Sequence, residues 1–146
     1  MFRKLFFGIV FSFLVFNSFT QNHVKWNFEY DNVTGKFSAE GKIEDGWHVY
    51  SKLTKSNAGP IPVRITFEKN PHVSIKGKPE EFGRPIKDFD KNFESMVFFY
   101  EHMYVLQTKM KIKKPTTLKG VISYMICNDT MCLPPIDVPF SVEVKP

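Results

Sequence analysis

Apolar and polar residues alternate along most of this chain, with the two-residue period that is typical of half-buried β-strands. In the segment 24–30, the residues Val24, Trp26, Phe28 and Tyr30 fall on one face. Further short segments that alternate or are wholly apolar lie at 37–43, 47–51, 63–67, 73–75, 96–100, 104–113, 118–126 and 138–144. No window after the first twenty residues has the period of an amphipathic helix.

This series of eight or nine short strands, with turn signals such as Asp45-Gly46 between them, predicts an all-β fold. We expect an immunoglobulin-like antiparallel β-sandwich, and a barrel is the second candidate. The chain has 146 residues, of which 42% are hydrophobic, and this is enough for one domain with a packed core. No internal repeat or low-complexity tract indicates a second domain.

Two segments are rich in the residues that interrupt strands. Residues 52–62 contain one glycine and two prolines and are expected to form a loop. Residues 76–92 combine glycine, proline and charge over a length that exceeds most connections, which favours a functional loop. We expect the apolar side chains in or beside this second loop, Phe82, Phe89 and Phe93, to fold back onto the domain.

The first twenty residues have the pattern of a secretory signal peptide. Arg3 and Lys4 precede an apolar run at 5–16, and the segment ends in Ser18-Phe19-Thr20. The run is shorter than the roughly 20 residues that a membrane-spanning helix needs. We therefore expect residues 1–20 to be removed, and residues 21–146 to form an exported domain, periplasmic in a bacterium.

The charge pattern argues against a nucleic-acid partner. Loss of Arg3 and Lys4 would lower the net charge from +5 to +3, because 18 basic residues would then face 15 acidic ones. The basic residues alternate with acidic and apolar ones instead of forming a stripe. We expect solvated faces, and a monomer.

The only two cysteines, Cys127 and Cys132, are separated by Asn128-Asp129-Thr130-Met131, in which the first three residues are typical of turns. If these four residues form a hairpin loop, the cysteines face each other with Cβ atoms about 4.5 to 5.5 Å apart. A disulfide is feasible there, with strain that would make it easier to reduce. An exported pair can form such a bond.

The spacing leaves more than one function for this pair. A dithiol that exchanges disulfides needs one accessible sulfur and a second close enough to resolve a mixed disulfide. A structural disulfide that locks a hairpin in an exported binding module is the alternative, although so short a loop gains little from a staple. A copper(I) site that uses Met125 and Met131 is a third interpretation, and core packing explains those methionines better.

Other chemistry has no support in the sequence. The histidines His23, His48, His72 and His102 show no zinc-ligand spacing, and we interpret them as ordinary histidines. Paired carboxylates, a phosphate-binding glycine loop and a Ser-His-Asp pattern are also missing from the sequence. We expect no cofactor and no metal.

The string from Tyr124 to Pro135, with Cys-x-Asp followed by Cys-x-Pro-Pro, resembles the N-terminal periplasmic domain of the bacterial DsbD thiol:disulfide interchange proteins. The likeness extends over nearly all of residues 21–146, including Asp45-Gly46-Trp47-His48-Val49-Tyr50. It implies an immunoglobulin-like fold. It also implies that the domain takes electrons from a thioredoxin-like domain and passes them to oxidised periplasmic thiol proteins, such as disulfide isomerases and cytochrome c maturation factors.

The resemblance also implies roles for single residues. Cys132 would form mixed disulfides with partners, and Cys127 would resolve them. A loop phenylalanine covers the cysteine pair in this family, and the best match is Phe93, in Asp90-Lys91-Asn92-Phe93. Asp90 and Tyr50 would then flank the site.

Two features depart from the best-known members of the family. Here four residues separate the cysteines, where those members have five. The membrane-spanning and thioredoxin-like parts of those proteins have no counterpart in these 146 residues. We therefore expect a free-standing domain that meets its electron donor in trans, and contacts the membrane only indirectly, through a transmembrane electron transporter.

Overall fold

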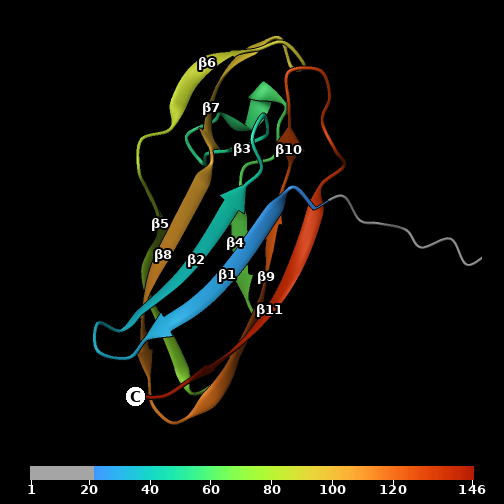
Figure 1. Cartoon of the computed structure of the whole chain (residues 1–146). Coiled ribbons are helices and arrows are strands. Elements are labelled where there is room, and N and C mark those ends of the chain that lie inside the picture. Colours follow the sequence, from blue (N-terminus) through green and yellow to red (C-terminus); the bar gives the residue numbers. More distant parts are fainter. Residues whose placement is uncertain (1–21) are drawn as a thin grey trace, which may run out of the picture.

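The computed structural model describes residues 22–146 (Figure 1). The predicted signal peptide, residues 1–20, lies outside this range. The strands are β1 (Val24–Asp31), β2 (Lys36–Ile43), β3 (His48–Tyr50), β4 (Arg64–Phe67), β5 (Val73–Phe82), β6 (Ile86–Asp90), β7 (Ser95–Glu101), β8 (Met103–Ile112), β9 (Thr116–Tyr124), β10 (Ile126–Cys127) and β11 (Ile136–Val144). A single 3₁₀ turn, Ser56–Ala58, is the only helical element in the described range.

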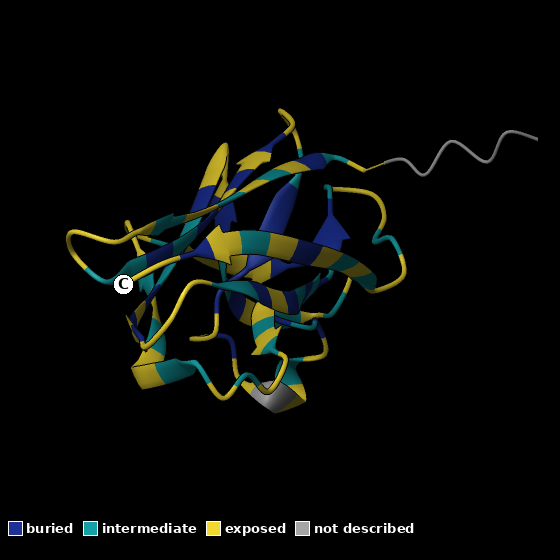
Figure 2. Ribbon diagram, turned by 90° about the horizontal axis from the view of Figure 1, so that it is seen from below, coloured by how far each residue is buried: buried dark blue, intermediate teal, exposed yellow. Residues whose placement is uncertain are grey.

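The strands form three antiparallel sheets. Sheet A has the order β1-β2-β8-β5, sheet B the order β10-β3-β7-β6, and sheet C the order β11-β9-β4. Buried and exposed residues alternate along many of these strands, which appears in Figure 2 as bands of dark blue and yellow. The prediction of an all-β antiparallel sandwich is confirmed.

The main core lies between sheets A and C. Phe28 of β1 stacks on Phe140 of β11 with ring centroids 4.6 Å apart, and Phe37 of β2 lies 5.3 Å from the same ring. The alternation seen in the sequence places these aromatic side chains on the inner faces, where their burial stabilises the fold. This packing fixes the two layers against each other.

Sheet B lies at one end of the sandwich, at the top of Figure 1. The chain connects it to both of the other sheets. The turn at His102, which has a positive φ of 62°, joins β7 of sheet B to β8 of sheet A. Met125 interrupts the predicted strand 118–126, so that β9 stays in sheet C and β10 pairs with β3 in sheet B. The cysteines are thereby carried to the end of the molecule.

The prediction of a loop at 76–92 is wrong. Most of this segment forms β5 and β6, which are the edge strands of sheets A and B. Gly77, with a φ of +84°, and Pro79 lie where the pairing between β5 and β8 shifts register, between Lys76 and Glu80. An edge strand tolerates a bulge and a proline because one side of its backbone needs no ladder partner.

The expectation that three phenylalanines fold back onto the domain holds for one of them. Phe82 and Phe89 are 44% and 54% exposed, whereas Phe93 packs against a buried cluster in sheet B.

Among the described residues, no helix is long and apolar enough to cross a membrane.

Candidate redox site

Cys127 and Cys132 face each other across a short hairpin. Cys127 ends β10 and forms an isolated antiparallel bridge with Cys132. The amide of Asn128 donates to the carbonyl of Met131, and the amide of Leu133 donates to the carbonyl of Ile126, both at 2.9 Å. The two cysteines are therefore a non-hydrogen-bonded pair, the closer of the two pair types. Their Cα atoms are 4.0 Å apart, and a disulfide joins their sulfurs.

The side chain of Asn128 shapes the loop between the cysteines. Its Oδ1 atom accepts hydrogen bonds from the amides of Thr130 and Met131, both at 2.9 Å, and from the Thr130 hydroxyl at 3.0 Å. An asparagine that caps its own turn in this way fixes the backbone without strand pairing. The predicted turn chemistry of this segment is thus confirmed.

The two cysteines differ in their exposure to solvent. Cys127 is completely buried, whereas Cys132 is partly exposed. Attack by a partner thiolate requires a direct approach to one sulfur of the bond. Cys132 offers that approach, and Cys127 does not.

A turn at residues 91–94, here called the cap turn, joins β6 to β7 beside the disulfide. It brings Phe93 against a buried cluster of Tyr50, Val97 and Cys127. The rings of Phe93 and Tyr50 meet edge to face, with centroids 6.1 Å apart. Glu94 closes the turn with a left-handed φ of 49°.

The ring of Phe93 packs directly against the backbone of Gly59. The φ of Gly59 is +107°, and a Cβ atom added there would lie 2.4 Å from Cδ1 of Phe93. Only a residue without a side chain lets the ring approach the backbone this closely. Gly59 lies in the predicted loop 52–62, and no pattern in the sequence indicated a role for it.

We expect Gly59→Ala to push Phe93 off the cluster, because an overpacked contact of this kind costs about 1 to 3 kcal/mol. The disulfide should then react at least about fivefold faster with a small phosphine reductant. Gly46→Ala is the matched control, because Gly46 also has a positive φ, +82°, but has nothing within 4 Å of an added Cβ. Equal rates for the two variants would show that the close contact between Gly59 and Phe93 does not hold the cap turn in place.

Asp90 organises the cap turn from the end of β6. Its Oδ1 atom accepts the amides of Asn92 at 2.7 Å and of Phe93 at 3.2 Å. Its Oδ2 atom accepts the hydroxyl of Tyr50 at 2.5 Å. Asp90 is only 8% exposed, so its charge is stabilised by these three donors in place of water.

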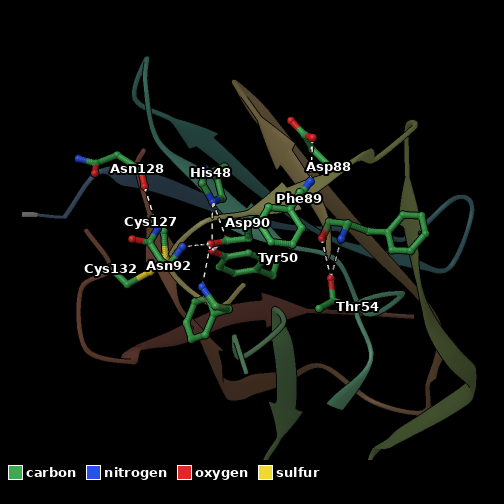
Figure 3. Close-up of polar contacts among 12 residues, drawn as sticks. His48, Tyr50, Thr54, Asp88, Phe89, Asp90, Asn92, Cys127, Asn128 and Cys132 are labelled. Carbon is green, nitrogen blue, oxygen red and sulfur yellow. Dashed lines mark hydrogen bonds and ion pairs between the residues drawn. A yellow bond between two sulfur atoms is a disulfide. The ribbon is translucent and has the colours of Figure 1, made fainter. Parts of the chain in front are cut away.

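His48 extends this chain of hydrogen bonds (Figure 3). Its Nε2 atom lies 3.1 Å from the Tyr50 hydroxyl and 3.9 Å from Oδ2 of Asp90. Burial, and then the bonded Asp90 carboxylate, raise the pKa of Tyr50 far above its ordinary value. Tyr50 therefore keeps its hydrogen at neutral pH.

The cap turn and the cysteine hairpin also contact each other. Nδ2 of Asn92 donates to the backbone carbonyl of Asn128 at 3.2 Å. A cavity of about 250 Å³ lies beside this contact, and its lining includes His48, Asp90 and Asp129. Movement of the cap turn away from the hairpin would therefore widen this cavity.

All five residues predicted for the site lie together: Cys127, Cys132, Phe93, Tyr50 and Asp90. The predicted site did not include His48, Gly59 or the hydrogen bond between Asn92 and Asn128. Strand alternation could have revealed His48, because positions 48 and 50 share one face of a strand.

The two methionines proposed as copper ligands are not equivalent. Met125 packs against the cysteine cluster, and Met131 is 49% exposed. No group of three or more His, Cys, Asp or Glu side chains within residues 22–146 is arranged to hold a metal.

Solved structures with this fold include N-terminal domains of DsbD and ScsB proteins. The DsbD N-terminal domain of Neisseria meningitidis in its reduced form aligns with a TM-score of 0.63 and 16% identity, over 85% of this chain and 87% of that chain. The complex between the DsbD N-terminal and PilB N-terminal domains of the same organism gives a TM-score of 0.59 and 15% identity, over 81% of this chain and 80% of that chain.

The N-terminal periplasmic domain of ScsB from Proteus mirabilis gives a TM-score of 0.56 at 18% identity, and the match covers 84% of this chain and 45% of that one. These likenesses agree with the predicted immunoglobulin-like sandwich. No curated protein matches the chain. The model of the family described as thiol:disulfide interchange protein DsbD, N-terminal, matches residues 17–143. The chain therefore belongs to the family of DsbD N-terminal domains.

Proposed function

We propose that this protein is a periplasmic thiol–disulfide exchange module. It takes electrons from a thioredoxin-like donor and passes them to oxidised periplasmic thiol proteins through the Cys127–Cys132 disulfide. The observation that carries this proposal is the unequal exposure of the two bonded cysteines, with Cys127 buried and Cys132 partly exposed.

Reduction of the domain follows from this geometry. A donor thiolate attacks Sγ of Cys132, and the Cys127–Cys132 bond breaks as the mixed disulfide forms. The electron pair of the broken bond stays on Sγ of Cys127, which takes up a proton. A second donor thiolate then attacks the donor sulfur of the mixed disulfide and releases Cys132, so that two electrons have entered the domain and the donor has become a disulfide.

Oxidation by an acceptor reverses these steps. The Cys132 thiolate attacks the acceptor disulfide, and one acceptor sulfur leaves as a thiolate and is protonated. Cys127 then loses its proton, attacks Sγ of Cys132 and releases the reduced acceptor. The hairpin supports this resolving step because the two cysteines face each other with Cα atoms 4.0 Å apart. The electrons stay on sulfur throughout, so the exchange needs no bound cofactor.

Phe93 supports selectivity in this scheme. Its ring packs on the cluster that contains Cys127, so small oxidants meet an apolar side chain before they meet the site. A partner that displaces the cap turn would widen the approach to Cys132. Covering of the cysteine pair by a loop phenylalanine is also what the family resemblance implies.

The comparisons support the kind of partner and the compartment. A DsbD N-terminal domain with this fold is described in complex with a PilB N-terminal domain, and the related ScsB domain is described as periplasmic. We propose that this domain likewise docks with separate redox domains, including a thioredoxin-like donor. Export by the predicted signal peptide at 1–20 would place it where such partners are found.

A purely structural role for the disulfide gains little support from its position. By the loop-entropy estimate, closing a loop this short stabilises a protein by about 2 kcal/mol, against about 4.7 kcal/mol for a 100-residue loop. Backbone hydrogen bonds from Asn128 and Leu133 already hold this hairpin. A binding module that is stapled by this bond is the alternative that the experiment below tests.

The proposal is tested with reduced thioredoxin as a model donor. After mixing, free thiols are alkylated, and the mass of the domain is measured over time. We expect the oxidised domain to gain two thiols and thioredoxin to lose two. A disulfide that stays intact under excess reduced thioredoxin would overturn the exchange function and leave the structural role.

A further inference from the structure

A buried chain of hydrogen-bonded polar side chains lies behind the cap turn. It begins at His48, which the exchange steps do not use. It runs from His48 through Tyr50 to Asp90, and these residues are 9%, 0% and 8% exposed (Figure 3). His48 also pairs in register with Cys127, on the neighbouring strand β10. A polar chain buried beside the disulfide is costly unless every member is bonded.

The number of available hydrogens decides which way these bonds run. Tyr50 has one hydroxyl hydrogen, and the carboxylate of Asp90 can only accept, so the hydroxyl donates to Asp90. The Tyr50 oxygen can then only accept at the His48 contact, so Nε2 of His48 carries a hydrogen and donates. In neutral His48 the unprotonated nitrogen is therefore Nδ1.

We propose that His48 is a positioning residue for the cap turn, and that protonation of His48 favours the open cap. This inference rests on the proposed function, because it assumes that the cap turn controls access to the redox pair. By donating to the Tyr50 oxygen, His48 keeps the Tyr50 hydroxyl oriented so that its hydrogen points at Oδ2 of Asp90. Asp90 in turn accepts the two amides that shape the cap turn around Phe93.

The groups that face His48 set the direction of the pH effect. They are Tyr50 on the same strand, Asp88 and Asp90 of β6, Lys91 of the cap turn, Glu101 of β7 and Asp129 of the hairpin. Burial lowers the pKa of His48 by more than the carboxylates of Asp90, Glu101 and Asp129 raise it. The closed cap therefore favours neutral His48.

Opening the cap changes this balance. Asp90 and Asn92 would leave their present contacts, and more water would reach the imidazole of His48, a residue that is only 9% exposed in the closed state. The burial penalty would fall, while Glu101, on β7, would remain beside His48. The pKa of His48 is thus higher in the open state than in the closed state, and the open state binds more protons.

The sign of the effect follows from linkage. Stabilisation of the closed cap by neutral His48 is complete above the ordinary histidine pKa of about 6.5. It is lost as the pH falls through this value toward the lowered pKa of the closed state. Mild acid should therefore open the cap and expose the disulfide.

The experiment measures the rate at which a phosphine reductant attacks the disulfide of the full domain between pH 5 and pH 7.5. His48→Gln keeps a side-chain N–H donor but does not titrate, so the ratio of wild-type rate to His48→Gln rate cancels the pH dependence of the reductant. We expect this ratio to rise by roughly three- to tenfold from pH 7.5 to pH 5. His48→Phe, which has no donor, should react faster than wild type at both pH values.

His102→Gln is the matched control. His102 is an exposed histidine that lies 3.2 Å from Asp45, outside the cap network, so its loss should leave the pH profile unchanged. A flat ratio for His48→Gln would overturn the pH coupling, and a wild-type rate for His48→Phe would overturn the positioning role. Neither result concerns exchange with thioredoxin, so a failure here is distinguishable from a failure of the proposed function.

Nuclear magnetic resonance of the imidazole provides a readout that does not depend on a His48 variant. In the oxidised wild-type domain, His48 should titrate below the ordinary histidine range. In Phe93→Ala, with a weakened cap, it should titrate closer to that range. The same titration in both proteins would contradict the coupling between His48 and the cap turn.

Discussion

Cys127→Ser is expected to convert the domain into a covalent trap for its partners. Cys132 is the partly exposed cysteine, so it can still attack a partner disulfide when Cys127 is replaced by serine. Without Cys127 the mixed disulfide cannot be resolved internally, and adducts should accumulate in the periplasm. Non-reducing gels and mass spectrometry of the purified variant would identify them.

The opposite variant is the control. Cys132→Ser leaves only Cys127, which is completely buried, and it should form few or no adducts at equal export. The difference in adduct yield between the two variants should be large, because Cys132 is present in one and absent from the other. If the two variants trapped partners equally, or if Cys132→Ser trapped more, the assigned roles of the two cysteines would be wrong.

Asp90→Ala should have the largest effect on stability among the residues around the disulfide. It removes the acceptor of the buried Tyr50 hydroxyl and of the amides of Asn92 and Phe93. Loss of a charged acceptor that leaves one buried donor, the Tyr50 hydroxyl, unpaired costs about 2 to 4 kcal/mol. Urea unfolding should show this loss, and the disulfide should react faster with a small reductant because the cap turn loses its organiser.

Asp88→Ala is a suitable control for this prediction. Asp88 lies on the same strand, is exposed, and bonds only the amide of its neighbour Phe89, at 2.7 Å. We expect its effect on the free energy of unfolding to stay within about 0.5 kcal/mol. Equal destabilisation by both substitutions would show that Asp90 has no special part in the cap turn.

The sequence predicted most strands because two-residue alternation survives wherever one face of a strand is buried. It failed for residues 76–92, where glycine, proline and charge suggested a loop. The actual strands β5 and β6 lie at sheet edges, and β6 buries only Asp90. An edge strand has little need for an apolar face, so periodicity could not reveal it.

The candidate site likewise has a part that the sequence predicted and a part that it did not. Local spacing was enough to predict the facing cysteines, because the hairpin is built from residues that are adjacent in the sequence. The contact between Gly59 and Phe93 and the chain from His48 to Asp90 join segments that lie far apart in the chain. Such contacts depend on how sheet B is assembled, which no local pattern contains.

The reduction potential of the Cys127–Cys132 disulfide tests the central claim most directly. The oxidised domain is equilibrated with thiol buffers of known potential, and the fraction reduced is measured after alkylation. The account predicts a potential above about −300 mV, within reach of thioredoxin-like donors near about −270 mV. A potential well below about −300 mV would mark the bond as structural and would contradict the account.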